Sequence, residues 1–271
     1  LSDGAHLRVF CKYEAGRSHR GHGHRAGVAY EAEVYAAILA PSKCSAPLFF
    51  GKHRDRESGD TWLFIEALDG KSIANTHRLD SRVVLPEAAG WIGRFHADFA
   101  SRAHEFPNIK RYDASYYRGF VNRVIEFSRE SSGRYPWLTA VCRRADEFIA
   151  QLLAAPRTMI HGEFYPGNIL YEKGRICPVV WESAAIPAGE VDLAALTEGW
   201  SPQLITECEQ AYTRSRWSNG PPTEFPRTLA AARFYWAFRW LGDSRRRFHH
   251  HRKSDATLAR MLEEAQRWPL I

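Results

Sequence analysis

Residues 157–182 constrain the fold of this chain more than any other stretch. Three short apolar runs alternate here with polar segments, and they lie at 159–160, 169–171 and 176–181. Apolar runs of this length, bounded by polar and turn-forming residues, predict three strands. The polar side chains of the loop 161–168 are then placed where strands end.

A tight turn is predicted at Lys173-Gly174, between the second and third runs. A hairpin with this turn pairs Glu172 with Arg175, and counting back along the ladder puts Asn168 within one residue of Val180. The loop that contains Asn168 and the segment that begins at Val180 are therefore expected to lie side by side and to form one site.

The side chains brought together in this way suit phosphoryl transfer. In that chemistry a carboxylate accepts the proton of the attacking hydroxyl, while amide and carboxylate oxygens hold the magnesium ion that bridges the nucleotide phosphates. Glu163 and Asn168 supply the first carboxylate and the amide.

The same loop resembles that of a known family. Residues 161–170 read His-Gly-Glu-Phe-Tyr-Pro-Gly-Asn-Ile-Leu, which resembles the His-Gly-Asp-x-x-x-x-Asn catalytic loop of the aminoglycoside phosphotransferase and choline kinase family. Val-Trp-Glu at 180–182 falls where that family has Asp-Trp-Glu, and 190–194 resembles its following Asp-Leu-Ala segment. The resemblance covers most of residues 7–241.

The resemblance implies a protein-kinase-like two-lobe fold of the α/β (α+β) class that uses ATP and Mg²⁺. We expect a small β-rich N-terminal lobe at residues 1–69 and a larger helical C-terminal lobe at residues 70–271. The family's first hairpin, which covers the phosphates, should precede the first strand. It is not in the sequence, through either truncation or real loss.

Several site residues follow from the resemblance. It implies Glu163 as the catalytic base and Asn168 as a metal ligand. His161 and Asp192 are expected to brace the catalytic loop by hydrogen bonds, the alternative for Asp192 being simple capping of a helix.

Two positions depart from the family pattern. Glu163 replaces the catalytic Asp, and its extra methylene moves the carboxylate by about an ångström, which costs roughly 100-fold in rate when geometry is tight. Val180 replaces the main magnesium-binding Asp and offers no lone pair to a cation. Glu182, two residues on and thus on the same face of an extended strand, is the candidate metal ligand that remains.

An ion pair is expected in the N-terminal part. Residues 7–13 alternate as a strand that carries Lys12, and a helix ending at Pro41 has an apolar face made of Val34, Tyr35 and Ile38, with Glu31 on it. A carboxylate on a buried face needs a cation, and the resemblance implies that Lys12 is its partner in a kinase-type ion pair. The resemblance implies that this pair contacts the nucleotide phosphates; Glu33, on the outer face, is the alternative acid.

The strand predicted at 62–68 leads into the hinge of the family. The resemblance implies that backbone groups of Glu66, Ala67 and Leu68 hold the adenine, and it places the lobe boundary near residue 70.

The segment 16–27, near the start of the chain, contains three histidines and no acidic or cysteine ligand. A flexible basic loop is favoured there over a metal site, and its arginines would help to hold phosphates.

The remainder is predicted to be largely helical. Expected helices are one opened by Pro86, those at 115–127 and 137–153, one that starts at Ser201-Pro202, and those at 225–241 and 256–268.

Composition limits the environment and the ligand. No run of 18 apolar residues exists, so no membrane span is expected, and five scattered cysteines indicate reduced thiols in a cytoplasmic protein. The basic segment 245–253 is interpreted as a solvated surface loop rather than a nucleic-acid site. A net charge of +6 favours a neutral or anionic small-molecule substrate over a polycationic one. The sequence does not indicate an oligomeric state.

Three hypotheses for the function remain open. The first is an ATP- and magnesium-dependent phosphotransferase of a small hydroxylated metabolite or antibiotic. The second is a pseudokinase, a binding or scaffold protein that keeps the cleft and has lost the metal site. The third is an enzyme that uses the cleft for metal-free chemistry with Glu163 as general base.

Overall fold

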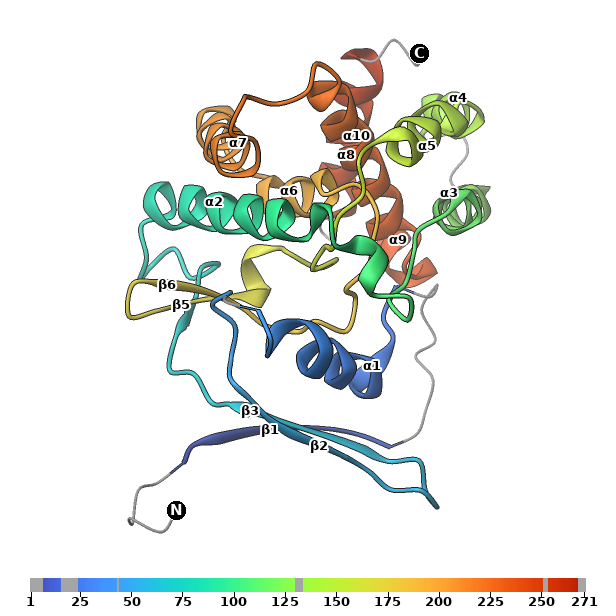
Figure 1. The fold of residues 1–271 in the computed structure, drawn as a ribbon. Coiled ribbons are helices and arrows are strands. Elements are labelled where there is room, and N and C mark those ends of the chain that lie inside the picture. Colours follow the sequence, from blue (N-terminus) through green and yellow to red (C-terminus); the bar gives the residue numbers. More distant parts are fainter. Residues whose placement is uncertain (1–6, 16–23, 43, 130–133, 251–252, 268–271) are drawn as a thin grey trace.

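The computed structural model describes residues 7–15, 24–42, 44–129, 134–250 and 253–267. Figure 1 shows a small sheet-rich N-terminal part below a larger helical part, which confirms the expected fold class. The N-terminal sheet is antiparallel in the order β1-β3-β2, and its strands are β1 (Val9–Glu14), β2 (Phe49–Arg54) and β3 (Thr61–Glu66).

Helix α1 (Gly27–Val34) lies between this sheet and the helical part (Figure 1). A π-helical turn, η1 (Tyr35–Leu39), continues it up to Ala40, so the helix ends before Pro41 as expected. At its other end Glu14 of β1 accepts a hydrogen bond from the Val28 amide at 2.6 Å. This carboxylate satisfies one of the amides that every helix leaves without an internal partner.

A second small sheet has the order β4-β5-β6, with β4 (Lys71–Ser72), β5 (Ile169–Glu172) and β6 (Arg175–Pro178). Glu172 pairs with Arg175 across the predicted turn, where Lys173 and Gly174 both have positive φ. The Val179 amide donates to the Asn168 carbonyl at 2.9 Å. The predicted register is therefore confirmed.

The other two predicted strands differ from the structure. Strand β6 ends at Pro178, and Val180 has a φ of 70°, which an extended strand does not contain. The prediction that Glu182 shares a strand face with Val180 is therefore wrong. The run at 159–160 is not a strand either, because only isolated bridges from Arg157 and Ile160 join it to residues 185–188.

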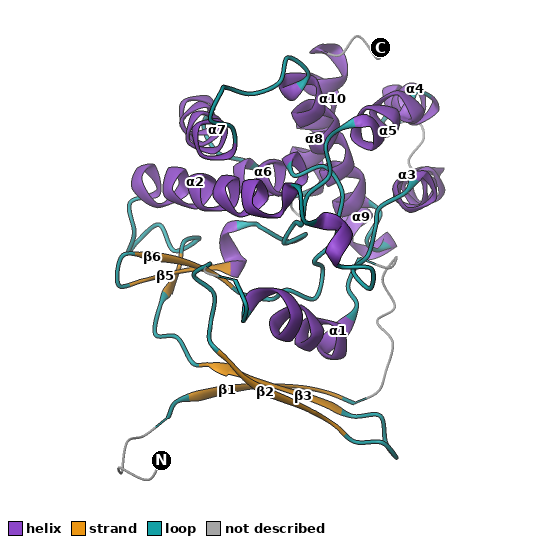
Figure 2. Ribbon diagram, in the orientation of Figure 1, coloured by secondary structure: helices purple, strands orange, loops and turns teal. Residues whose placement is uncertain are grey.

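The helical part contains the longer elements seen in Figure 2. They are α2 (Ser81–Ala100), α3 (Ala114–Ser128), α4 (Pro136–Arg143), α5 (Ala145–Ala154), α6 (Glu190–Thr197), α7 (Pro202–Arg216), α8 (Phe225–Leu241), α9 (Arg245–His250) and α10 (Ser254–Arg267). Two short 3₁₀ turns, η2 (Ala103–Glu105) and η4 (Pro166–Asn168), interrupt the loops. Among the described helices none has the length and apolarity that crossing a membrane requires.

Three helix predictions need correction. Helix α2 begins at Ser81, because Asp80 caps it by accepting the Arg82 amide at 3.0 Å, and Pro86 lies inside it. The helix predicted at 137–153 is two helices, α4 and α5, which break at Arg144. The basic segment after 245 is not a loop, since residues 245–250 form α9.

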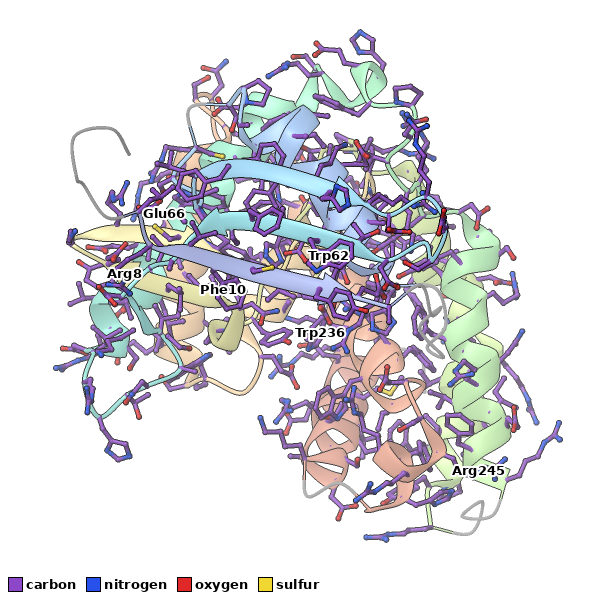
Figure 3. The ribbon with its side chains drawn as sticks, turned by 90° about the horizontal axis from the view of Figure 1, so that it is seen from below. Arg8, Phe10, Trp62, Glu66, Trp236 and Arg245 are labelled. Atoms are coloured by element: carbon purple, nitrogen blue, oxygen red, sulfur yellow. The ribbon has the colours of Figure 1, made fainter. Side chains whose placement is uncertain are left out.

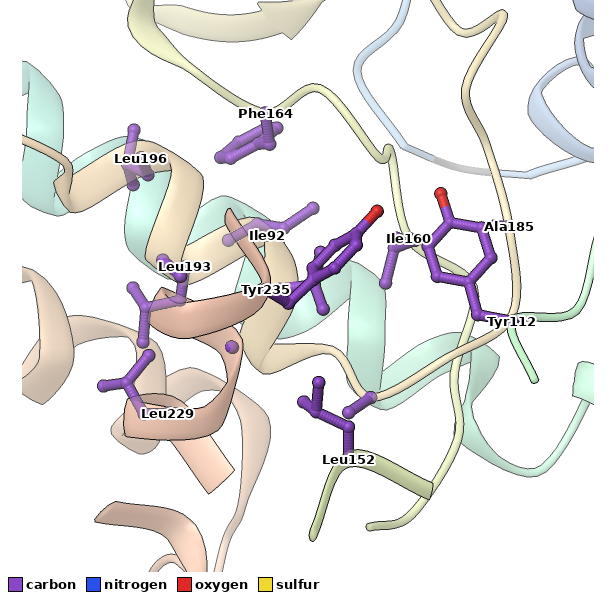
Figure 4. Packing of buried hydrophobic residues seen from close by; sticks show 14 of the residues in the cluster. Ile92, Tyr112, Leu152, Ile160, Phe164, Ala185, Leu193, Leu196, Leu229 and Tyr235 are labelled. Carbon is purple, nitrogen blue, oxygen red and sulfur yellow. The ribbon is translucent and has the colours of Figure 1, made fainter. Parts of the chain in front are cut away.

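The catalytic loop predicted at 161–168 rests on the main hydrophobic core. Figure 4 shows Ile160, which directly precedes the loop, and Phe164, which belongs to it, beside buried residues from other elements such as Ile92 of α2 and Tyr235 of α8. Ile92, Ile160 and Phe164 are fully buried. Packing on both sides therefore fixes the position of this loop.

Candidate functional site

Asp192, in the first turn of α6, holds the backbone of the catalytic loop. Its Oδ2 accepts the His161 amide at 2.7 Å, and its Oδ1 accepts the Gly162 amide at 2.9 Å. The buried His96 of α2 lies 3.3 Å from the same Oδ2. Asp192 is thus a brace for the loop in this structure rather than a simple helix cap.

His161 continues this brace with its ring. Its Nδ1 accepts the Glu163 amide at 3.2 Å, and its Nε2 lies 2.9 Å from the Val179 carbonyl, to which it donates. Burial lowers the pKa of His161, and Asp192 offsets this only in part. The ring is therefore neutral at physiological pH and joins the loop to the end of β6.

Acidification should weaken this brace. Burial lowers the pKa of His161 and of His96 below the ordinary value of 6.5, so the unfolded chain takes up protons first as the pH falls. Stability then decreases from about pH 6.5 downward, by up to about 1.4 kcal/mol per pH unit for each histidine. Urea denaturation followed by circular dichroism between pH 8 and 5 measures this slope.

Two variants test whether the pH dependence of the free energy of unfolding comes from this site. His161→Asn should reduce the slope of this free energy against pH by the contribution of one histidine. His53→Asn, at an exposed position of β2, should leave the slope as in the wild type. An unchanged slope in His161→Asn would contradict the assignment.

Glu163 is buried and ion-paired with two arginines. Its Oε1 accepts Arg239 Nη2 of α8 at 2.9 Å and Arg25 Nη2 at 3.2 Å. Arg239 also donates to the Gly162 carbonyl. Burial lowers the pKa of Arg239, but Tyr235 and Glu163 more than offset this, so the net shift of its pKa is upward. Within the described part of the chain, Glu163 Oε2 is buried without a hydrogen-bond partner.

Arg25 lies between two carboxylates. Its guanidinium contacts Glu163, and its Nε lies 3.7 Å from Glu182 Oε1. The neighbouring Ala26 amide donates to the Glu182 carbonyl at 3.0 Å, which fixes the backbone here. Burial lowers the pKa of Arg25, while Glu163 and Glu182 raise it and prevail. Arg25 is therefore permanently charged.

The residues at the predicted metal position do not fit magnesium. The Val180 side chain offers no oxygen, and Glu182 is already paired with Arg25. Asn168, whose Nδ2 donates to the Glu163 carbonyl at 3.2 Å, leaves only its neutral Oδ1 for a cation. Searched over the described ranges alone, the chain has no cluster of three or more His, Cys, Asp or Glu that could hold a metal.

Val180 also has an unusual backbone. A φ of 70° is a genuine outlier for a β-branched residue and costs about 1–3 kcal/mol. Asp and Asn adopt this conformation more easily because their short polar side chains can hydrogen-bond locally. The strain lies at the position where the resemblance places an Asp.

The ion pair expected between Lys12 and Glu31 is present. The other oxygen of Glu31 accepts the Trp181 amide at 2.9 Å, so this buried carboxylate joins β1 and α1 to the segment 180–182. Burial raises the pKa of Glu31, and Lys12 opposes that rise. Glu33 pairs with Lys52 of β2 instead. A contact of Lys12 with phosphates stays a prediction.

The predicted hinge follows β3. The Glu66 amide donates to the Leu48 carbonyl at 2.8 Å and the Ala67 amide to the Arg8 carbonyl at 3.2 Å. Figure 3 shows Arg8 and Glu66 together at one end of the sheet, with Trp62 farther along it. Both amides thus already have partners, and adenine binding by these residues and Leu68 stays a prediction.

A cavity of about 720 Å³ opens beside Glu163 and extends towards α8 and α10. Trp200, Trp236 and Trp240 are among the residues that line it. Arg239 lies over the Trp236 ring at 5.0 Å, while Arg247 lies over the Trp240 ring at 4.3 Å. Cation–π contacts of this kind stabilise the positions of the arginines and the rings relative to each other.

The charge of the cavity wall is predominantly positive. Five cationic side chains line it, and they are Arg25, Arg239, Arg247, Lys253 and Arg260. Only three carboxylates do so among the residues described, and they are Glu163, Glu198 and Asp243. An anionic or neutral ligand suits this wall better than a polycation.

Sequence reasoning missed the two arginines on Glu163. Arg239 lies in an aromatic stretch of α8 whose pattern predicts core packing. The signal that could have revealed its role is the presence of a charged residue among buried ones. Arg25 belongs to the basic segment 16–27, of which residues 16–23 lie outside the described residues. Arg25 and Glu163 are 138 residues apart, so periodicity cannot reveal their pairing.

Comparisons with known proteins agree with this architecture. Residues 8–215 match the sequence model of the Phosphotransferase enzyme family. No curated protein sequence matches the chain at a significant level.

Several solved structures share the fold. A GDP complex of an aminoglycoside 2'-phosphotransferase has a TM-score of 0.63 at 12% identity, over 88% of this chain and 80% of that one. An amicoumacin kinase bound to AMP-PNP and Ca²⁺ has 0.62 at 13%, over 97% and 82%. A putative aminoglycoside phosphotransferase from Ralstonia eutropha has 0.61 at 13%, over 98% and 94%.

Proposed function

The chain belongs to the phosphotransferase enzyme family, and from this premise we propose that it binds a small neutral or anionic molecule in its cleft without magnesium-dependent phosphoryl transfer. The observation that carries this proposal is the environment of Glu163. Its carboxylate is neutralised by Arg239 and Arg25, and the metal position nearby holds Val180. Such a protein is a pseudokinase in the functional sense.

The ion pairs occupy one oxygen of Glu163. Arg239 and Arg25 both donate to its Oε1, and Arg239 also donates to the Gly162 carbonyl. An oxygen that accepts from two guanidinium groups is not available to a substrate hydroxyl. Glu163 therefore serves the cleft as a structural anion that holds α8 against the catalytic loop.

The cavity beside Glu163 supports the ligand class. Its positive wall suits an anionic or neutral group, and its three tryptophan rings offer flat apolar surface. Glu163 Oε2 needs a donor, which a ligand hydroxyl would supply. A small hydroxylated molecule with an aromatic or apolar body meets these conditions.

Two further assignments belong to this proposal. We place the boundary between the N-terminal lobe, residues 1–69, and the C-terminal lobe, residues 70–271, at the end of the segment that follows β3. A cytoplasmic location is supported by the free state of all five cysteines.

The decisive experiment is a phosphoryl-transfer assay with labelled ATP, magnesium and a panel of small alcohols. Wild type and Glu163→Gln should both remain at background, because neither has a competent base or metal site. Magnesium-dependent turnover in the wild type that Glu163→Gln abolishes would overturn the proposal. Val180→Asp tests the lapsed metal site, and turnover that appears only in this variant would support the loss of an ancestral activity.

Ligand binding has its own readout in tryptophan fluorescence. Titration with hydroxylated aromatic acids should change the emission of the wild type, and Trp236→Phe should lose most of that change. Trp217→Phe is the matched control, because Trp217 packs on Phe225 away from the cavity. Equal responses in the two variants would place the ligand elsewhere.

Phosphoryl transfer is the second candidate function. The Lys12–Glu31 ion pair and the Asp192 brace both favour it, since a kinase-type site requires a phosphate clamp and a fixed catalytic loop. In this case Glu163 Oε2 would accept the hydroxyl of the substrate. The labelled-ATP assay separates the two candidates.

A further inference from the structure

We propose that Arg25 takes the place of the metal cation, so that the cleft binds phosphate-bearing ligands in their metal-free form. This inference rests on the proposed function, in which magnesium has no site. It goes further, because it assigns the cation to a side chain of this protein and specifies the ionic form of the ligand.

The position of Arg25 carries the first step. Its guanidinium contacts Glu163 at 3.2 Å and Glu182 at 3.7 Å, and these are the predicted base and the predicted metal ligand. Two carboxylates brought this close repel each other unless a cation lies between them. Arg25 supplies that charge from inside the chain.

The fixed backbone around Arg25 carries the second step. The Ala26 amide donates to the Glu182 carbonyl, and Glu14 caps the first turn of α1 through the Val28 amide. Arg25 therefore enters the site from an anchored helix start. A divalent ion would have to displace a charge that is tethered here, which costs more than displacing water.

Exposure carries the third step. The Arg25 side chain is one-third exposed, whereas the side chain of Arg239 is 5% exposed. Arg25 also lines the cavity. Its planar fork has five donors, and the two carboxylates do not use all of them, so it can bind a phosphate oxygen directly.

Lys12 of β1 is a second cation near the segment 180–182. It pairs with Glu31, which accepts the Trp181 amide, while Arg25 pairs with Glu182. The two cations thus flank adjacent residues of the 180–182 segment. A bound magnesium ion would cancel the ligand charge that attracts such cations.

Calorimetry with ATP tests this inference. In EDTA the wild type should bind ATP at least as tightly as it binds magnesium–ATP. Arg25→Ala should weaken metal-free binding by about ten- to a hundredfold, since a charge-assisted hydrogen bond contributes about 1.5–3 kcal/mol. Arg54→Ala, at an exposed position of β2, is the matched control and should bind as the wild type does.

Three outcomes would overturn the inference: binding that requires magnesium, no binding of ATP at all, or equal affinity of Arg25→Ala and the wild type in EDTA. Arg25→Lys keeps the positive charge but lacks the planar guanidinium group. An affinity for ATP between those of Arg25→Ala and the wild type would show that the guanidinium geometry contributes to binding. Turnover in the phosphoryl-transfer assay would instead contradict the proposed function, so the two failures are distinguishable.

Manganese binding gives a second readout that needs no nucleotide. Electron paramagnetic resonance should detect no saturable Mn²⁺ site in the wild type and only a weak one in Val180→Asp. The double variant Arg25→Ala with Val180→Asp should gain a saturable site, because Glu163 and Glu182 then lose the cation between them and residue 180 adds a third carboxylate. Equal Mn²⁺ binding by Val180→Asp with and without Arg25 would contradict the role of the guanidinium.

Discussion

Replacement of Arg239 by methionine is expected to lower the free energy of unfolding by about 3–5 kcal/mol. The substitution leaves Glu163 buried with one arginine instead of two and removes a donor from the Gly162 carbonyl. Breaking a buried ion pair is costly because the remaining charge loses its compensation while it stays out of water. Urea denaturation of Arg239→Met at pH 7.5 measures the loss.

Two further variants test the cause. Arg245→Met removes an exposed ion pair with Glu126 and should cost no more than about 1 kcal/mol. The double variant Arg239→Met with Glu163→Gln removes both charges and should recover part of the stability. A loss in Arg239→Met no greater than in Arg245→Met would show that the buried pair does not hold α8 to the loop.

Gly162→Ala is expected to be nearly as damaging, with a loss of about 3 kcal/mol or more. Gly162 has a φ of 81°, and an added Cβ would fall on the carbonyl oxygen of Ser183, 2.8 Å from its carbonyl carbon. The clash is with backbone, so no rotamer change can relieve it. Relaxation would have to move the catalytic loop away from residues 183–185.

Gly174→Ala is the matched control. Gly174 has nearly the same φ, 77°, but an added Cβ there meets no atom within 4 Å. This variant should show the conformational cost alone, about 1–2 kcal/mol. Comparing the thermal melts of the two variants therefore separates the cost of a left-handed backbone at alanine from the cost of the clash with Ser183. Similar melting temperatures would mean that the loop and residue 183 are not tightly packed.

Local spacing predicted the β5–β6 hairpin and the core-facing position of Glu31, whereas the family resemblance identified Lys12 as the partner of Glu31. The turn at Lys173-Gly174 fixes the hairpin register through its own length, and the helical periodicity around Glu31 fixes which acid faces the core. Both features depend on short-range geometry and on the rule that a buried charge needs a partner.

The chemical state of the site could not be predicted in the same way. Arg239 reaches Glu163 from a helix that follows it by more than seventy residues, and Arg25 reaches it from near the start of the chain. Neither contact leaves a periodic signal. The φ of Val180 is equally hidden, because valine is a residue that normally indicates an extended strand.

Helix boundaries were mispredicted for a local reason. A proline such as Pro86 is typical of the first turn of a helix, yet Asp80 is the stronger start signal because its side chain caps the helix. The break at Arg144 has no glycine or proline to mark it, so residues 137–153 read as one amphipathic helix.

The left-handed backbone at Val180 has a consequence for the history of the gene. A valine codon that ends in a pyrimidine becomes an aspartate codon by a single base change, and the backbone at this position already suits aspartate better than valine. A return to the acidic residue is thus one mutational step away and is not opposed by folding. Removal of Arg25, whose guanidinium contacts both Glu163 and Glu182, is the second change that a magnesium site would require under the inference drawn above.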